Sequence, residues 1–574
     1  MAKDWLIPPV TPEIETAGRR WNVPPLLAQL LVNRGHSPDQ PAADFLSPQL
    51  KDLHPPHRLP GIDGAVEAIW AAIQSRANIV LYGDYDVDGI TGVAILWHVL
   101  QRVNADVTYY VPHRIEEGYG LSLAATRRLL SEGAGLIVTV DCGITAVEVA
   151  AAIRAAGVPL VITDHHALQT MLPEADAIVH PALGGAYPNG DLCGAGVAFK
   201  LAWALAQRFS GAEKVTPQFR ELLLDLLPMA ALGTIADVVP LIGENRIIAK
   251  QGLAALPKSR LPGLRALMES AGLTGDRVSG HDVGFKLAPR INAAGRMGHA
   301  RLAVELFTRA NDIRAREIAT YLEDHNRVRQ KTERHIAKQA YEMVELNGLA
   351  SDARRAIVLA SAGWHSGVIG IVAARVVERY HRPTVLIALG DGDGQGSARS
   401  IRNFDLAGAL AACQGHLLSF GGHAMAAGLR IAGHRVDDFR EAFVRTANQR
   451  LTGMDLLPKL RIDAEVGLGA LTLPVVQTIS VLGPFGIGNP KPRLATDFVE
   501  LADEPRCVGR NDEHLQVTFH QNGARLKAIG FGMASLAEDL KHHRRCRVAF
   551  EPIINDYQGR KTVELQIVDL KFPS

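Results

Sequence analysis

The sequence predicts an α/β protein with two parallel-sheet α/β domains joined by long helices, plus a small β-barrel at the C-terminal end. Three observations indicate this architecture. Strand and helix patterns alternate over 78–166 and again over 351–455, a charge-rich stretch over 299–347 contains neither glycine nor proline, and strand-like runs dominate after residue 458. With 574 residues the chain is also too long for one hydrophobic core.

The sequence of residues 1–300 predicts an accessory segment followed by a βαβ domain. Residues 1–55 are rich in proline and short apolar patches, which indicate short helices. In 56–300 the buried-strand runs NIVLYG, GLIVTVDCG and PLVITDHH alternate with helix-like runs. This rhythm predicts a parallel sheet with helices on both faces, whose ligand crevice lies at the carboxyl ends of the strands.

The sequence of residues 301–574 predicts connecting helices, a second domain and a barrel. Residues 301–350 favour long helices that bridge two domains, although an ordinary surface helical hairpin fits the pattern equally well. Residues 351–455 repeat the strand and helix alternation in a smaller α/β domain. Residues 456–574 carry HLQVTFH, CRVAFEPII and TVELQIVDLKF, which are typical of a barrel such as the OB-fold, a common binder of single strands.

Composition limits the class of protein without identifying a partner. Lys and Arg total 61 against 60 Asp and Glu, a net charge of +1, so any basic surface for a nucleic acid has to be local. The five cysteines are scattered and form no Cys-x-x-Cys pair. That argues against a disulfide framework or a structural zinc site and fits a reducing cytoplasm. The apolar stretches are too interrupted to span a membrane.

Acids and histidines follow the predicted strands of the first domain at the point where each strand ends. Since the carboxyl ends of parallel strands meet at one edge of a sheet, we expect these side chains to lie together. One further acid comes from a separate segment, GTIADVVPL. The cluster is Asp84, Asp86, Asp88, Asp141, His165, His166 and Asp237.

This cluster predicts a divalent metal. Residues two apart on an extended chain point the same way, so the three acids of YGDYDVDG can face one point, where they would repel one another without a cation. Carboxylates with imidazole suit manganese or magnesium better than zinc, and there are enough ligands for two ions that share a bridging carboxylate. Asp88 alone reads equally well as a helix N-cap, and Asp164 is expected to orient its neighbours rather than bind metal.

Cleavage of a phosphodiester also needs groups that hold the non-bridging oxygens, and arginine suits this because its planar fork binds phosphate at two points. Several polar residues stand in glycine-rich stretches, including PRINAAGR, which we expect to be a loop. For each of them a solvated or ion-paired side chain is the ordinary alternative. The candidates are Arg114, Arg290, Asn292, Arg296, His365, Ser397, Arg399 and His423.

At this point the sequence resembles a known family. YGDYDVDGIT, VTVDCG, TDHH and ADVVPL, in this order, resemble the four motifs of the DHH phosphoesterase family. Its bacterial single-strand DNA exonucleases are similar over nearly the whole chain. The additional matching stretches are LAPRINAAGRMGHA, WHSGVIGIVAARV, GSARS, FGGHAMAAG and PFGIGNPKP.

The resemblance implies roles for individual residues. One metal site would use Asp84 and Asp86 with Asp141, and the other would use Asp88, Asp141, His165 and Asp237, so that Asp141 bridges the two. His166 would contact the scissile phosphate. The catalytic set would therefore be Asp86, Asp88, Asp141 and His166. In the second domain, which would be of the DHHA1 type, Ser397 and Arg399 would bind the 5′ phosphate, with Arg296 nearby.

The implied function is 5′→3′ exonucleolytic degradation of single-stranded DNA to 5′-mononucleotides, in DNA repair and recombination. The implied cofactors are two Mn²⁺ or Mg²⁺ ions. Single-stranded DNA is the implied partner, a single-strand-binding protein and a helicase are candidate protein partners, and a membrane is not expected. Two alternatives stay open: a DHH phosphodiesterase for short oligonucleotides or cyclic dinucleotides, and a non-catalytic replication scaffold that keeps the fold.

Overall fold

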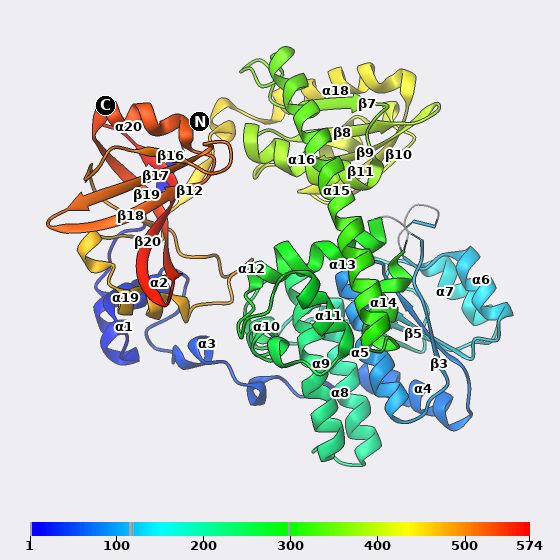
Figure 1. Cartoon of the computed structure of the whole chain (residues 1–574). Coiled ribbons are helices and arrows are strands. Elements are labelled where there is room, and N and C mark those ends of the chain that lie inside the picture. Colours follow the sequence, from blue (N-terminus) through cyan, green and yellow to red (C-terminus); the bar gives the residue numbers. More distant parts are fainter. Residues whose placement is uncertain (1–2, 114–116, 119, 297–298, 574) are drawn as a thin grey trace. The chain divides into compact units, whose positions relative to one another are not determined.

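The computed structural model describes residues 3–113, 117–118, 120–296 and 299–573, except for the side chain of residue 296. Its contacts divide the chain into two compact units (Figure 1). The first unit consists of Val10–Asn326 and Thr472–Pro492, and the second of Met1–Pro9, Arg327–Leu471 and Arg493–Ser574.

Within the residues that the structure describes, no helix combines the length and the apolar character needed to cross a membrane.

A parallel sheet forms the centre of the first unit, as predicted for 56–300. Its strands are ordered β3-β2-β4-β5-β6, and neighbouring strands pair in parallel. The bounds are β2 Ile79–Gly83, β3 Val107–Tyr110, β4 Leu136–Val140, β5 Leu160–Thr163 and β6 Ala177–Val179.

Helices cover both faces of this sheet because successive side chains of a strand point to opposite sides. Ile79 and Leu81 of β2 belong to one core, and Val80 and Tyr82 belong to another. Burying one such side chain stabilises the fold by about 1.5–3 kcal/mol. The first core includes α4 (Ile62–Gln74), α5 (Val87–Arg102) and α8 (Gly194–Ser210), and the second includes α6 (Leu123–Ser131) and α7 (Val147–Ala155).

Further helices complete the first unit, and one of them corrects a prediction. PRINAAGR is helical rather than a loop, because a π-helical turn at Val283–Leu287 leads directly into α13 (Ala288–Arg296). Ile291 and Ala294 of α13 are buried, and this apolar face outweighs the weak helix propensity of the glycine. The other helices are α1 (Glu13–Trp21), α2 (Pro25–Val32), α3 (Ala43–Leu46), α9 (Pro217–Ala236), α10 (Gly243–Ala255), α11 (Pro262–Ser270), α12 (Gly280–Asp282), α14 (Ala300–Thr308) and α19 (Leu473–Ser480).

The predicted connection over 301–350 is dominated by one continuous helix. Helix α15 (Asp312–Leu346) is 35 residues long and begins in the first unit and ends in the second. The alternative of a surface hairpin is therefore wrong.

The sheet of the second domain is mixed, so the prediction of a parallel sheet over 351–455 is wrong. β7 and β8 pair in parallel, whereas β9, β10 and β11 are antiparallel to their neighbours, in the order β10-β11-β9-β8-β7. Only the tripeptide 390–392 joins β8 to β9, and so short a connection requires antiparallel strands. The elements are β7 (Ile357–Ser361), α16 (Ser366–Tyr380), β8 (Thr384–Leu389), β9 (Asp393–Arg399), α17 (Leu406–Ala412), β10 (Ser419–Gly422), β11 (Ala426–Ala432) and α18 (Val436–Arg450).

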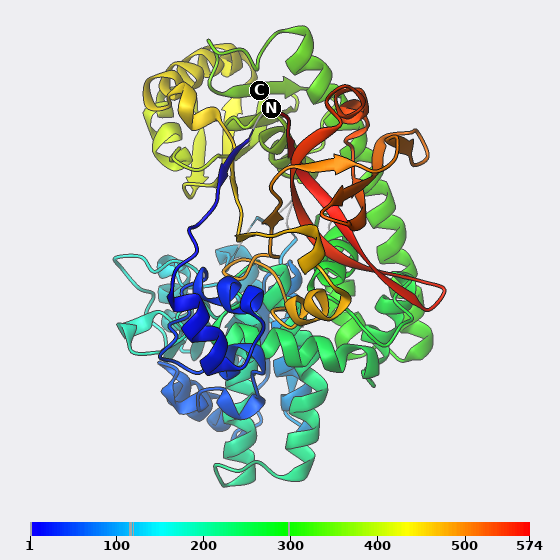
Figure 2. The same cartoon turned by 90° about the vertical axis from the view of Figure 1, so that its left-hand side faces the viewer.

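The C-terminal region forms the predicted barrel. Strands β15, β17, β18, β20 and β19 pair in a closed ring in which β18 and β20 are parallel. The N-terminal strand β1 (Asp4–Leu6) pairs with β12 (Lys459–Arg461) beside it (Figure 2). The Trp5 Nε1 donates to Asp569 at 2.7 Å. The remaining elements are β13 (Ala464–Glu465), β14 (Leu494–Ala495), β15 (Val499–Leu501), β16 (Arg506–Val508), β17 (His514–Gln521), β18 (Ala524–Gly530), α20 (Ala537–His543), β19 (Arg545–Tyr557) and β20 (Arg560–Lys571).

Candidate metal centre

The predicted acids and histidines gather at the carboxyl edge of the parallel sheet. Asp84 directly follows β2, Asp141 follows β4, and His165 comes two residues after β5. Their ligand atoms fall into three overlapping groups, each within 4.8 Å. These groups are Asp84–Asp86–Asp141, Asp88–His165–Asp237 and Asp141–His165–His166.

The structure answers the question of which acid caps helix α5. Asp86, rather than Asp88, caps helix α5, because its Oδ1 accepts from the backbone N–H of Asp88 at 2.9 Å and of Gly89 at 3.1 Å. Asp88 is buried, and its carboxylate accepts hydrogen bonds from the backbone N–H groups of Gly194 and Ala195, at 2.5 and 2.9 Å. These amides begin helix α8, whose positive end stabilises a carboxylate.

Asp141 sits in a strained and crowded position. Its φ is 64°, in the left-handed region that a residue other than glycine seldom adopts. A Cβ on Gly194 would lie 2.6 Å from the Cβ of Asp141, so α8 can approach this acid only because it begins with glycine. Such strain persists where the surrounding structure holds it, often at functional sites.

His165 stands between the acids. Its Nε2 lies 3.1 Å from Asp141 Oδ1, 3.6 Å from Asp237 Oδ2 and 3.7 Å from Asp88 Oδ2. Asp237 reaches this point from the C-terminal end of helix α9. Burial lowers the pKa of His165, which favours the neutral imidazole that a metal ligand requires.

Asp164 orients the His-His pair, the role that the sequence suggested. Its Oδ1 accepts from the backbone N–H groups of His165 and His166 and lies 2.7 Å from His166 Nδ1. Burial alone would raise the pKa of Asp164, but the hydrogen bonds from His166 hold it below its ordinary value. Burial would likewise lower the pKa of His166, and the bond to Asp164 holds it above the usual range.

The electrostatics of the cluster fit a divalent cation. Burial and then repulsion from Asp88 raise the pKa of Asp141 well above its ordinary value, and the same two causes raise the pKa of Asp237 to about 8. Carboxylates packed this closely need positive charge between them. Oxygen ligands with one or two imidazoles are the donor set of Mn²⁺ or Mg²⁺. Among the described residues, the ligand groups at this edge contain carboxylates and imidazoles but no thiol of the kind that zinc favours.

The phosphate-binding candidates of the first unit have varied surroundings. Arg290 forms a largely buried ion pair with Glu323 at 2.7 Å. An ion-paired side chain is the alternative to phosphate binding that the sequence left open for this arginine. Asn292 is half-buried on α13. Arg114 lies outside the described residues, as does the side chain of Arg296. Their roles in binding substrate stay predictions.

Sequence reasoning missed a contact that α13 makes with the segment that carries the candidate ligands Asp84 and Asp86. A Cβ on Gly295 would lie 2.5 Å from the carbonyl oxygen of Tyr85, the residue between Asp84 and Asp86. The helix therefore rests directly on this segment. The sequence signal for this contact is the glycine in AAGR, which lets the helix come close to Tyr85.

In the second domain three of the candidates lie at helix α16: His365 at its N-terminal end, and Ser397 and Arg399 opposite Gly370. Ser397 and Arg399 lie on the same side of β9, and Arg399 Nη1 donates to Ser397 Oγ at 3.2 Å. His365 caps α16, with its Nδ1 accepting from the backbone N–H of Gly367 at 3.1 Å. His423 is exposed in the turn between β10 and β11.

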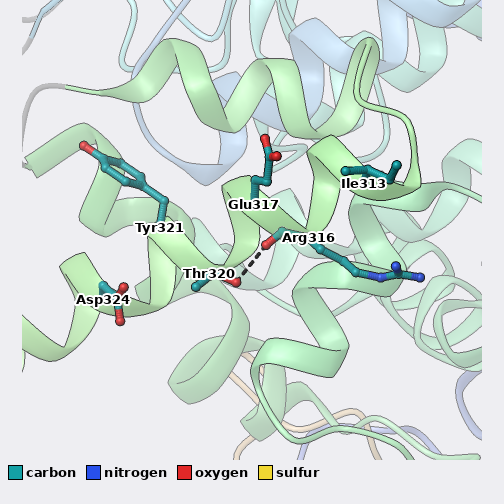
Figure 3. A pocket seen from close by; sticks show the side chains of 6 residues that line it. All are labelled: Ile313, Arg316, Glu317, Thr320, Tyr321 and Asp324. Carbon is teal, nitrogen blue, oxygen red and sulfur yellow. Dashed lines mark hydrogen bonds between the residues drawn. The ribbon is translucent and has the colours of Figure 1, made fainter.

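A surface depression along α15 lies apart from the predicted residues. Figure 3 shows its lining side chains, with the Thr320 hydroxyl bonded to the Arg316 carbonyl at 2.8 Å. Two carboxylates against one guanidinium make a poor site for a polyanion. The lining is Ile313, Arg316, Glu317, Thr320, Tyr321 and Asp324, without a predicted site residue among them.

The fold and the site define a metal-binding phosphoesterase of the DHH class. Three family models match the chain: the DHH family N-terminal domain over 78–231, the DHHA1 domain over 354–450 and the RecJ OB domain over 462–569. The chain belongs to the RecJ family of single-stranded-DNA-specific exonucleases.

Relatives of known name support this membership. The single-stranded-DNA-specific exonuclease RecJ of Bacillus subtilis is 38% identical over 97% of this chain and 69% of its own length. That of Escherichia coli is 33% identical over 97% of this chain and 98% of its own. The crystal structure of Thermus thermophilus RecJ in complex with Mn²⁺ matches with a TM-score of 0.84 and 31% identity, covering 100% of this chain and 79% of that one.

Proposed function

We propose that this protein is a single-stranded-DNA-specific exonuclease that removes 5′-mononucleotides from the 5′ end by two-metal phosphodiester hydrolysis, in DNA repair and recombination. The observation that carries the proposal is the set of overlapping ligand groups at the edge of the parallel sheet, each within 4.8 Å, in a chain of the RecJ family. Relatives of this family have been crystallised with Mn²⁺ and with Mg²⁺.

Two divalent cations would be held by ligand sets that share Asp141. Asp84 and Asp86 would complete one set, and Asp88, His165 and Asp237 the other, in keeping with the groups described above. Cations at these positions supply Lewis-acid charge neutralisation and a lowered pKa for an attacking water. The protein contributes the geometry, since the amides of α8 hold Asp88 and the backbone at Asp141 is itself constrained.

His166 is proposed to contact the scissile phosphate. Because Asp164 holds its Nδ1, the opposite ring nitrogen, Nε2, would donate to a phosphoryl oxygen. The side chain is 40% exposed, whereas that of His165 is 12% exposed, so His166 is the more accessible of the two to a substrate. The aspartate thus serves as a positioning residue for a phosphate contact.

The polarity of digestion is proposed to come from the second domain, where Ser397 and Arg399 would hold the 5′ phosphate. A hydroxyl and a guanidinium side by side form a recognition pair for a phosphate. A Cβ on Gly370 of α16 would lie 2.8 Å from Ser397 Oγ, so the helix approaches this pair closely. His365 at the start of α16 and the exposed His423 are further candidates.

The decisive experiment is digestion of one long single strand labelled at either end, with Mn²⁺, Mg²⁺ or EDTA. We expect the 5′ label to appear at once as a mononucleotide, the 3′-labelled strand to shorten progressively, a duplex to resist, and EDTA to stop the reaction. Release of the 3′ label first would contradict the polarity.

The same experiment separates the alternatives. Hydrolysis of a dinucleotide or a cyclic dinucleotide with an intact long strand would favour a small-substrate phosphodiesterase. Metal binding without any cleavage would favour a non-catalytic scaffold. A cytoplasmic location stays a proposal, supported by the free cysteines. Partnership with a single-strand-binding protein or a helicase also stays a proposal, supported by the family.

A further inference from the structure

A short turn at 484–490 departs from the barrel region of the chain and packs within the first unit. Gly486 and Asn489 close the turn with mutual backbone hydrogen bonds of 2.9 and 3.2 Å. Asn489 is fully buried, and its Nδ2 donates to the carbonyls of Leu482 and Pro484, both at 2.8 Å. The turn is therefore a built, rigid element rather than a linker.

Two arginines anchor this turn to the first unit. Arg246 is 2% exposed, lies 3.8 Å above the ring of Phe45 and donates to the Gly483 carbonyl at 3.0 Å. Arg34 donates to the side chain of Asn489 and, at 2.7 Å, to the carbonyl of Pro490. Hydrogen bonds from charged groups are among the stronger ones in proteins.

The turn contacts the segment that follows Asp237. The Ile487 carbonyl accepts from the Leu241 N–H at 2.7 Å. A Cβ on Gly486 would lie 2.8 Å from Leu241 Cδ1, and one on Gly488 would lie 3.2 Å from Pro240 Cβ. The glycines thus let the turn press directly on this segment.

The segment itself has little freedom. Val238, next to Asp237, has a φ of 64°, a conformation that valine adopts only under constraint. Asn245 Nδ2 of α10 donates to the Pro240 carbonyl at 3.1 Å. Pro240 and Leu241 are therefore held both by α10 and by the 484–490 turn.

We propose that the 484–490 turn is a positioning element of the metal centre, which fixes Asp237 beside Asp88 and His165 through its contact with Leu241. This inference rests on the metal-binding role proposed above. Groups that orient metal ligands from outside typically change metal affinity 10- to 100-fold when they are removed. A turn that only joined two parts of the chain would have no such effect.

The test is a calorimetric titration of the full-length, metal-free protein with Mn²⁺. We compare Gly486→Val, which pushes on Leu241, and Asn489→Ala, which loosens the turn, with Gly469→Ala, where a Cβ meets its nearest atom only at 3.9 Å. The two turn variants are expected to bind the ion held by Asp237 about 10- to 100-fold more weakly. The Gly469 variant should match the parent.

Two further readouts distinguish this effect from damage to the fold. The thermal midpoint of Gly486→Val in EDTA should stay close to that of the parent, and its cleavage rate should recover as Mn²⁺ is raised. If both turn variants fold and bind Mn²⁺ like the parent, the inference is wrong while the metal centre stands. If the parent and Asp237→Asn bind Mn²⁺ equally, the ligand role of Asp237 is wrong and the inference falls with it.

Discussion

The edge of the parallel sheet and the Ser397–Arg399 pair beside α16 share a local feature, a glycine that lets a helix come close, but their side chains carry opposite charges. At the first site a helix beginning with Gly194 approaches the buried anions Asp141 and Asp88. At the second site a helix containing Gly370 approaches Ser397 and the guanidinium of Arg399. In both, a missing Cβ allows the helix to come close to candidate site residues on or after a strand.

The difference lies in what each site needs to complete it. Burial and mutual repulsion raise the pKa values of Asp141 and Asp237, so the first site calls for cations. The second pairs a permanent cation, Arg399, with the hydroxyl of Ser397, and we propose that it takes an anion such as phosphate. We therefore expect changes at the first site to affect metal binding and chemistry, and changes at the second to affect substrate binding.

The largest expected effect comes from Asp141→Asn, which removes the proposed bridging charge. We expect kcat to fall on the order of 10³-fold or more, because cations at such a site contribute several kcal/mol to the transition state. The metal-free variant should also unfold at a higher temperature than the parent, since repulsion among buried carboxylates is relieved. Single-turnover cleavage and thermal unfolding in EDTA measure the two effects. Near-normal turnover at saturating Mn²⁺ would refute the bridging role.

The next largest effect is expected for Gly194→Ala. The added Cβ would meet Asp141 at 2.6 Å and displace the amides that hold Asp88, so Mn²⁺ affinity should fall about 10- to 100-fold. Gly190→Ala is the matched control, because a Cβ there meets no atom within 4 Å. Calorimetric titration of both variants provides the comparison, and equal affinities would show that close packing of α8 is unimportant for the centre.

A smaller effect should follow from Asp164→Asn, which weakens the hold on His166 Nδ1 without removing a proposed metal ligand. We expect kcat to fall about tenfold, at the lower end of the range for carboxylates that orient a histidine, while Mn²⁺ affinity changes little. Cleavage at saturating Mn²⁺ and a parallel titration separate the two quantities. A loss of affinity larger than the loss of kcat would mean that Asp164 supports the metal rather than the phosphate contact.

The smallest effect on chemistry is expected at the second site. Arg399→Ala should raise KM for a 5′-phosphorylated strand about tenfold, the loss of one charged hydrogen bond, and leave kcat nearly unchanged. Arg402→Ala, at an exposed position three residues away, serves as the control. Steady-state kinetics on strands with a 5′ phosphate and a 5′ hydroxyl provide the readout. An equal loss on both substrates would contradict recognition of the phosphate.

The sequence by itself determined the parallel sheet of the first domain and the residues that meet at its edge. Period-two strand patterns and strand-end acids are local signals, and a parallel topology converts them into proximity. This is why Asp84, Asp141 and His165 could be grouped before their distances were known. The barrel was likewise predictable, from strand-like runs separated by turn residues.

Tertiary structure alone decided how the cluster is supported. The amides of Gly194 and Ala195 hold an acid more than a hundred positions earlier in the chain, and the 484–490 turn contacts the segment after Asp237 from an even greater separation. Local patterns also misassigned two elements. The buried face of α13 outweighed the weak helix propensity of its glycine. In the second sheet, the three-residue connection between β8 and β9 made these strands antiparallel, although the alternation of strands and helices suggested a parallel sheet. Residue patterns report which side chains share a face, whereas contacts between distant segments depend on how those faces pack together.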